Sequence, residues 1–266
     1  MWEYGALKKR SPSITKILSP WVLITALVAL WHLTAISGAV PAFMLPGPVQ
    51  VVQAFVAEFP LLMQNLGVTL SEAGYGLLLA IAAAFLLAIL MDNSPFLRDS
   101  LTPILLLTQT IPTIAIAPLL VLWMGYGIAP KITLIFLTCF FPLTVGLLGG
   151  FAQADTDAIR LLQTMGANRR QIYRYIKLPG AMPAFFAGLK ISTSYSIVGA
   201  VVAEWLGGDG GLGVYMTRVR KSYSFDKMFA VIFLIAILSL LLMKLVTWLE
   251  RRWMPWQTRD DQPPNT

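Results

Sequence analysis

Six apolar segments of about 20 residues each constrain this 266-residue chain more than any other feature. A helix of ~20 apolar residues crosses the ~30 Å hydrocarbon core of a bilayer. Only 12% of the residues are charged, against ~25% in a typical soluble domain, so a globule of this size lacks the charge to cover its surface. We therefore predict an all-α membrane protein with six transmembrane helices. The predicted spans are residues 21–40, 66–91, 101–124, 132–150, 184–206 and 228–249.

The distribution of lysine and arginine predicts the orientation. With the N-terminus inside, the cytoplasmic segments hold thirteen basic residues and the outer segments hold five, as the positive-inside rule requires. Both termini are then cytoplasmic, with an N-terminal segment 1–20, a membrane domain 21–250 and a tail 251–266. The first apolar segment follows basic residues as a signal peptide would, but its apolar run exceeds the 7–15 residues of such a peptide. We expect it to be retained.

The composition also excludes several kinds of site. One cysteine, Cys139, allows no intrachain disulfide, and with a single histidine, His32, the chain has no His/Cys metal cluster. The net charge of +7 is explained by the cytoplasmic loops, so we expect no nucleic-acid partner. We expect neither a catalytic residue nor a metal site in this chain.

Polar residues within two spans are candidates for a translocation pathway. The third span contains Gln109, Thr110 and Pro112, and the fifth contains Ser192 and Ser196. A proline removes a backbone donor and crowds the carbonyl four residues earlier, and freed polar groups in lipid need protein, water or substrate partners. We interpret the third span as a kinked helix that faces the pathway. The alternative is that these residues hydrogen-bond across helices and never contact substrate.

Small residues recur every four positions on two spans. Such ladders let helix backbones approach closely in lipid, within one subunit or between two, and we expect two copies of the chain to meet partly through them. Ionisable residues within membrane spans are candidates for a function, but Glu72 and Glu204 lie near span ends, and we interpret them as structural and solvated. The ladders are Gly76, Ala80, Ala84 and Ala88, and Gly188, Ser192, Ser196 and Ala200.

The loop 151–183 is long, charged and patterned. Asp155 or Thr156 is placed to cap a short helix that Gly166 ends, and Asn168 opens a second helix in a capping-box arrangement with Gln171. We expect Leu178-Pro179 to end this second helix. Apolar residues on one face of each helix indicate either a docking element or a loop that packs on its own bundle.

This loop resembles a known signature. Gly166, followed after nine residues by Ile176-Lys177-Leu178-Pro179, fits part of the EAA loop of permease subunits of bacterial ABC importers. Motifs along most of the chain resemble the nitrate/sulfonate/taurine-type permeases. They are Leu45-Pro46-x-Pro48, Gln109-Thr110-Ile111-Pro112, Ala117-Pro118-Leu119, Gly199-Ala200-x-x-Ala203-Glu204 and Gly211-Leu212-Gly213.

The resemblance implies the type I importer architecture in the bacterial plasma (inner) membrane. It implies a second copy of the chain, two copies of a separate ATPase subunit and an extracytoplasmic substrate-binding protein. ATP and Mg²⁺ would then bind to the ATPase, since this chain has no G-x-x-x-x-G-K-[ST] motif and is no enzyme itself. The loop would couple the ATPase to the spans. The coupling candidates are Asp155, Asp157, Arg160, Leu162, Gly166, Ala167, Ile176, Leu178 and Pro179.

One position departs from the family pattern. Arg160 and Leu162 stand where the E-x-A of the signature is expected, so the usual polar contact to the ATPase changes. Asp155 or Asp157 is placed to supply the negative charge from one turn earlier.

The substrate is less constrained than the class. Segments around Gln109 and after Glu204 look most like permeases for thiamine pyrimidine precursors. Riboflavin, taurine or alkanesulfonate, and nitrate are alternatives within the class. Outside it, a secondary transporter would need midplane ion sites and repeats, and a membrane enzyme would need clustered catalytic groups; neither is visible in the sequence.

Overall fold

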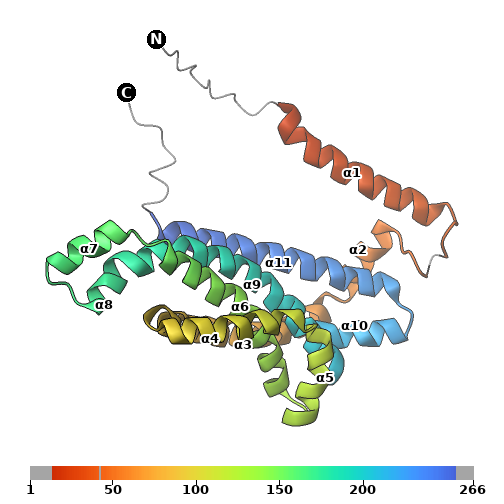
Figure 1. The fold of residues 1–266 in the computed structure, drawn as a ribbon. Helices are drawn as coiled ribbons and strands as arrows, with labels where there is room; N and C mark the ends of the chain where they lie inside the picture. The colour runs from red at the N-terminus through yellow and green to blue at the C-terminus, as the bar shows by residue number, and fades with distance from the viewer. Residues whose placement is uncertain (1–13, 42, 256–266) are drawn as a thin grey trace. The chain divides into compact units, whose positions relative to one another are not determined.

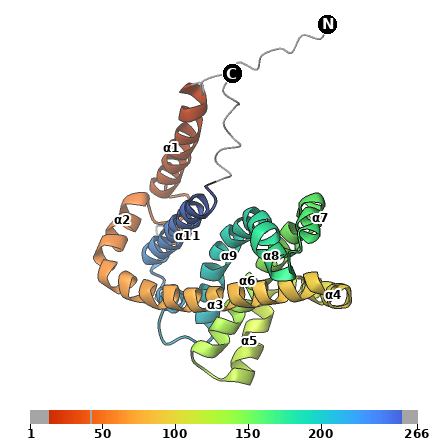
Figure 2. The same cartoon turned by 90° about the vertical axis from the view of Figure 1, so that its left-hand side faces the viewer.

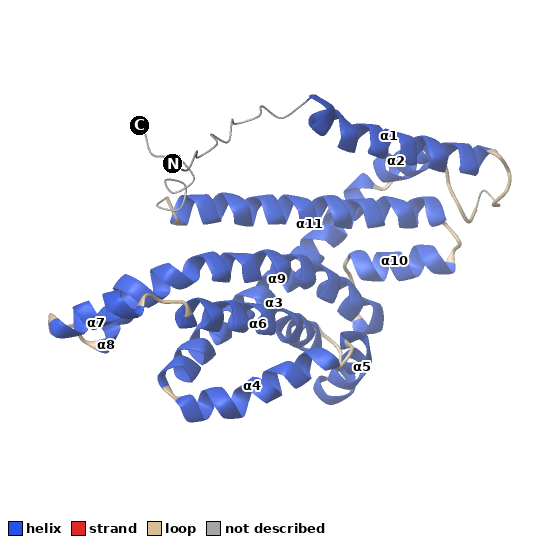
Figure 3. Cartoon of the chain, turned by 45° about the horizontal axis from the view of Figure 1, so that its top comes forward, coloured by secondary structure: helices blue, strands red, loops and turns tan. Residues whose placement is uncertain are grey.

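The computed structural model describes residues 14–41 and 43–255, with side chains from residue 21 onward. Every regular element in this part is a helix (Figure 3), which confirms the expected all-α class. The helices are α1 (Ile14–Ile36), α2 (Pro48–Ala57), α3 (Phe59–Asn93), α4 (Pro95–Thr110), α5 (Thr113–Met124), α6 (Ile128–Ala152), α7 (Thr156–Thr164), α8 (Arg169–Ile172), the π-helix η1 (Tyr173–Lys177), α9 (Leu178–Gly207), α10 (Leu212–Lys221) and α11 (Phe225–Trp253).

The chain divides into two compact units. One contains Met1–Glu58 and Val219–Ala230, and the other contains Phe59–Arg218 and Val231–Thr266. In the first unit, the Leu45-Pro46-Gly47-Pro48 segment leads directly into the short helix α2, with Pro48 at its first position. The Trp31 indole donates to the Pro46 carbonyl at 3.1 Å and its ring stacks on Phe229.

The second unit is built around α6, which packs against both α3 and α9 (Figures 1 and 2). Its core is a continuous apolar cluster from these helices and the later part of α11, including Ile135, Leu143, Phe185 and Leu238. This cluster gives the second unit a rigid bundle from which the loop α7–α8 extends.

Both small-residue ladders lie inside this bundle. Gly76 on α3 faces Ile135 of α6, and Gly188 on α9 faces the Pro142 backbone of α6. The expectation that two copies meet partly through these faces is wrong, because the chain's own α6 already covers them. The ladders are seams within one subunit, where small side chains let three helices approach.

The seam between α6 and α9 gives a stability prediction. A Cβ at Gly150 would lie 2.5 Å from the Ala181 Cα, whereas a Cβ at the neighbouring Gly149 would meet nothing within 4 Å. Gly150→Ala should therefore destabilise the purified chain by ~1–3 kcal/mol through overpacking, and Gly149→Ala should stabilise it by up to ~1 kcal/mol. Thermal unfolding in detergent measures both; equal melting temperatures for the two variants would contradict the seam.

Among the described residues, four helices are long and apolar enough to cross a membrane. The number of spans rises to five if two shorter helices joined by a sharp bend count as one span. The four are α3, α6, the continuous helical segment Arg169–Gly207, and α11. The first predicted span falls on α1, of which the part with described side chains, Trp21–Ile36, is shorter than a full crossing. By length and composition, the second, fourth, fifth and sixth predicted spans are therefore confirmed, and the count of six is not. Residues 1–13 and 256–266, on which the predicted cytoplasmic ends fall, lie outside the described part.

The predicted third span differs most from expectation. Instead of one kinked helix, the chain forms α4 and α5, which meet at Ile111 and Pro112 with a bend of 99°. Pro112 has no N–H, so the Thr108 carbonyl lacks its normal partner four residues later. Pro118, by contrast, lies inside α5 without breaking it. The pair is either a broken span or a re-entrant segment.

Candidate functional site

The loop between α6 and α9 begins with a well-capped helix that buries nothing. The Asp155 carboxylate accepts from the backbone N–H groups of Asp157 and Ala158, at 2.8 and 3.2 Å. This cap confirms the predicted start of α7 and satisfies two of its free donors. None of the residues of α7 is buried. A helix that packs on its own bundle would bury an apolar face, so α7 has the exposure expected of a docking element.

Gly166 forms the corner between the two short helices. Its φ is +81°, a left-handed conformation that glycine adopts without a Cβ penalty. The Ala167 N–H donates to the Leu162 carbonyl at 2.9 Å, and the Gly166 N–H donates to the Gln163 carbonyl at 3.0 Å. Asn168 and Gln171 then form the predicted capping box that starts α8. The corner is thus set by local hydrogen bonds.

The predicted end of the second helix at Leu178-Pro179 is wrong. α8 continues through the π-helix η1 directly into α9, so the loop and the fifth span share one continuous helical segment. The Leu178 N–H bonds to the Tyr173 carbonyl five residues back. This wider turn relieves the crowding that the Pro179 ring would cause in an α-helix. Ile176, Leu178 and Pro179 therefore belong to the junction between the loop and the span.

Asp92, at the end of α3, fastens this junction to the bundle. Its carboxylate accepts a hydrogen bond from the Tyr173 hydroxyl and pairs with the Lys177 ammonium at 2.5 Å. The Tyr173 ring also meets Phe151 edge to face, with 5.7 Å between ring centroids. Displacement of the loop would therefore pull on α3 as well as on α9.

Large apolar side chains remain exposed on the loop. Leu161 on α7 and Met165, which directly follows the last residue of α7, are 62% and 74% exposed, and Tyr175 is 63% exposed. Arg160, the departure from the family pattern, lies 3.6 Å from Asp157, and both side chains are largely exposed. Because Asp155 is occupied by its own helix, Asp157 is the better placed of the two acids to meet a partner.

The pathway candidates separate into two groups. Gln109 lines a cavity of about 280 Å³ beside the α4–α5 bend. Thr110 is exposed and its hydroxyl donates to its own helix at Leu107. Ser192 and Ser196 do not line the cavity but lie in the helix seam, where Ser192 donates to the Cys139 carbonyl and Ser196 to the Thr193 carbonyl.

A buried polar cluster was missed by the sequence reading. Glu204 is 1% exposed rather than solvated; it accepts from the Thr69 hydroxyl at 2.7 Å and from the Gly213 N–H at 2.6 Å. Thr69 accepts in turn from the Leu212 N–H, and Asn65 accepts from the Gly211 N–H. These side chains from α3 and α9 satisfy the free donors at the start of α10. The signal in the sequence is Glu204 followed by the glycines Gly211 and Gly213.

Close backbone approach explains the glycines of this cluster. A Cβ at Gly211, whose φ is +111°, would lie 2.2 Å from the Glu204 carboxylate, and a Cβ at Gly213 would lie 2.4 Å from the Val201 carbonyl oxygen.

Beside this cluster, Glu72 pairs with Lys131 at 2.6 Å, and both side chains are buried. The expectation that Glu72 is solvated is also wrong.

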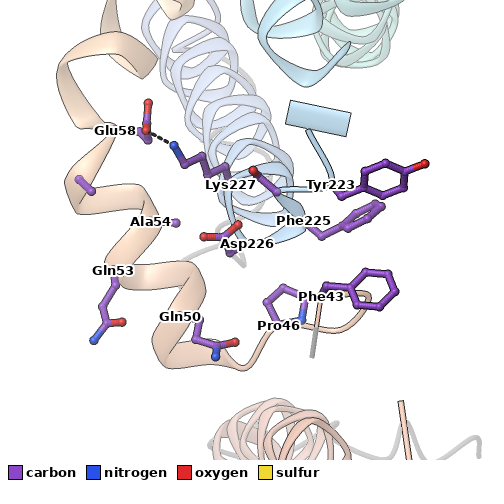
Figure 4. A pocket seen from close by; sticks show the side chains of 12 residues that line it. Phe43, Pro46, Gln50, Gln53, Ala54, Glu58, Tyr223, Phe225, Asp226 and Lys227 are labelled. Carbon is purple, nitrogen blue, oxygen red and sulfur yellow. Dashed lines mark hydrogen bonds and ion pairs between the residues drawn. The ribbon is translucent and has the colours of Figure 1, made fainter. Parts of the chain in front are cut away.

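The first unit has its own open hollow of about 650 Å³ (Figure 4). Gln50 and Gln53 of α2 line one side, and the rings of Phe43, Tyr223 and Phe225 line the other. Glu58 and Lys227 form an ion pair at its edge. Tyr223, which is 69% exposed, has a φ of +56°, which is rare for a residue with a Cβ.

Within the described residues, no group of three His, Cys, Asp or Glu is placed to hold a metal.

Comparison with known families decides the class. Residues 76–255 match the model of the binding-protein-dependent transport system inner membrane component. The chain belongs to this family. It is thus a multi-pass inner-membrane permease component.

Curated relatives agree with this assignment over nearly their whole length. A probable ABC transporter permease protein of Haemophilus influenzae is 36% identical, with 90% of this chain and 98% of the relative covered. The formylaminopyrimidine transport permease protein ThiX of Halalkalibacterium halodurans is 33% identical, with 91% of this chain and 97% of the relative covered. The taurine transport system permease protein TauC of Escherichia coli is 30% identical, covering 94% of each.

The fold is shared with a solved transporter. A chain of the MetNI methionine ABC transporter, in an inward-facing form, aligns with a TM-score of 0.66 at 19% identity. The alignment covers 74% of this chain and 97% of that chain. This likeness supports the type I permease architecture of the bundle.

Proposed function

We propose that this chain imports a small polar solute as the membrane subunit of an ATP-driven importer. Two copies of the chain would assemble with two copies of a separate ATPase, which binds ATP and Mg²⁺, and with one extracytoplasmic binding protein. The observation that carries the proposal is α7, a well-formed helix with no buried residue and with Leu161 and Met165 exposed. Exposed apolar side chains of this size, on an ordered helix, are typical of an interaction site.

The proposed mechanism is alternating access. Closure of the ATPase dimer on ATP moves the paired α7–α8 loops, and the loop passes this movement to the spans. The continuous segment from Arg169 to Gly207 carries the movement into the membrane without a flexible joint. The bond of Asp92 to Tyr173 and Lys177 links α3 to the same movement.

Our best candidate substrate is a hydroxymethylpyrimidine-type thiamine precursor. The similarity to a formylaminopyrimidine permease supports it. Riboflavin, taurine or alkanesulfonate, and nitrate stay as alternatives, since a taurine permease is almost as similar.

Among the pathway candidates, Gln109 is favoured because it lines the cavity at the bend, and Thr110 and Pro112 adjoin it. Ser192 and Ser196 are better explained as seam residues.

The binding protein would meet the chain at the segment between the first two spans. In the predicted orientation this segment faces outward and includes α2. The hollow beside α2 offers amide groups, exposed rings and an ion pair, a mixture that suits contact with a protein surface.

The docking proposal is tested by changing the exposed face of α7. Leu161→Asp combined with Met165→Asp should remove the ATPase from the purified complex and lower ATP-driven uptake at least ~10-fold, because central apolar contacts at interfaces are worth ~2 kcal/mol or more. The chain's own melting temperature should stay unchanged, since neither side chain is buried.

The matched control is Gln163→Asp. Gln163 is also exposed on α7 but points away from the Leu161 face, because two residues along a helix correspond to about 200°. This variant should keep the ATPase. If the double variant retains the ATPase as fully as the control does, α7 is not the docking helix.

A further inference from the structure

We infer that the cavity at the α4–α5 bend is a binding site for an uncharged, amino-substituted aromatic heterocycle. The inference rests on the proposed function, because it names the solute class that passes this point of the permease.

The lining of the cavity decides the charge of its ligand. Its polar side chains are Thr108, Gln109, Thr113, Thr138 and Tyr195, and the others are apolar. No side chain that lines it carries a charge. An anion such as a sulfonate or nitrate would lose its hydration here without gaining a counter-charge, which is costly in a low-dielectric site. The cavity therefore favours a neutral solute.

The hydrogen-bonding groups decide the chemistry. The hydroxyls of Thr108 and Thr138 donate to carbonyls of their own helices. The Gln109 carboxamide and the Tyr195 hydroxyl have no hydrogen bond recorded within the described part of the chain, and Gln109 is exposed at the end of α4. A carboxamide presents one donor beside one acceptor. This edge matches the ring-nitrogen and amino edge of an aminated heterocycle, as asparagine and glutamine match adenine.

The bend adds a wall and an acceptor. The Tyr195 ring, half exposed on α9, lines the cavity and offers an aromatic face on which a flat ring can stack. The Thr108 carbonyl, which has lost its helical donor to Pro112, is a further acceptor at the same place. At about 280 Å³, the cavity lies below the ~300–1,000 Å³ of sites for drug-sized ligands. A single-ring solute fits this size better than a three-ring flavin.

The test is protection of a cysteine from a thiol reagent. Thr113→Cys is introduced in a Cys139→Ala background, and the purified chain is treated with a water-soluble maleimide. 4-Aminopyrimidine should slow the labelling of position 113 in a saturable manner, and taurine at the same concentration should not. This readout needs neither ATP nor the ATPase, so it is independent of the proposed import.

Two variants tie the protection to the named groups. Gln109→Leu should raise the 4-aminopyrimidine concentration needed for protection about tenfold, the usual discrimination of one bidentate pair. Thr102→Val, an exposed position of the same helix α4 outside the lining, should leave it unchanged. Equal protection by taurine, no protection by 4-aminopyrimidine, or undiminished protection in Gln109→Leu would each overturn the inference. If the assembled complex imports its solute but 4-aminopyrimidine does not protect position 113, the proposed site is wrong and the proposed import stands.

Discussion

Replacing Gly166 with leucine should abolish ATP-driven uptake while the chain still inserts in the membrane. The φ of +81° at this corner places a leucine Cβ against the neighbouring carbonyl, a strain of ~1–3 kcal/mol. The corner is held by local bonds, including those from Gly166 and Ala167, and no buried residue of α7 resists a change in its direction. The helix should therefore reorient, and the docking geometry should be lost. Uptake into membrane vesicles and co-purification of the ATPase measure both effects.

Gly166→Asn is the matched control for this change. Asparagine tolerates the left-handed conformation far better than other residues with a Cβ. Apart from the adjoining residues of the chain, a Cβ at position 166 would meet nothing within 4 Å. We expect the asparagine variant to keep most of its uptake and its bound ATPase. If the leucine and asparagine variants lose activity equally, the conformation at the corner is not what matters. Full activity of the leucine variant would contradict the role of the corner altogether.

Replacing Glu204 with leucine should sharply lower the yield of folded chain. The Glu204 carboxylate satisfies the Thr69 hydroxyl and the Gly213 N–H in a site that is 1% exposed. Leucine leaves the Gly213 N–H without an acceptor, at ~1–3 kcal/mol, and leaves the Thr69 hydroxyl only its longer bond to the Asn65 carbonyl at 3.2 Å. The start of α10 should detach from α3 and α9. Size-exclusion chromatography and thermal unfolding in detergent measure the loss.

Two control variants show whether the loss of stability comes from these hydrogen bonds or from removing a carboxylate in general. Glu204→Gln keeps one acceptor oxygen and should be intermediate in stability. Asp209→Asn removes an exposed acid in the neighbouring segment and should unfold at the same temperature as the unmodified chain. A Glu204→Leu variant with an unchanged melting temperature would show that the cluster contributes nothing to stability.

The sequence predicted what depends on local chemistry. Helix ends at Asp155, Gly166 and Asn168 follow from capping residues and from glycine, which act within a few positions. The long apolar spans α3, α6 and α11 follow from composition alone. The motifs also identified the family, which the match over residues 76–255 confirms.

Features that depend on tertiary contacts were not predictable in the same way. Whether a proline breaks a helix depends on what satisfies the backbone groups that it frees. In the third span the helix breaks at Pro112 and continues through Pro118. Pro179 was expected to end a helix, but the π turn from Tyr173 absorbs it. Glu204 looked solvated because its partners Thr69 and Gly213 lie on other elements. The small-residue ladders showed that backbones approach, without showing that the partner is the chain's own α6.

The central claim is that a separate ATPase drives import through this chain, and reconstitution tests it most directly. The chain is placed in liposomes with the candidate ATPase, and the candidate binding protein and radiolabelled 4-amino-5-hydroxymethyl-2-methylpyrimidine are supplied on the opposite side. We predict accumulation that requires ATP, the ATPase and the binding protein together, and that stops when any one of them is omitted. Accumulation by the chain alone, driven by an imposed ion gradient and indifferent to ATP, would contradict the account.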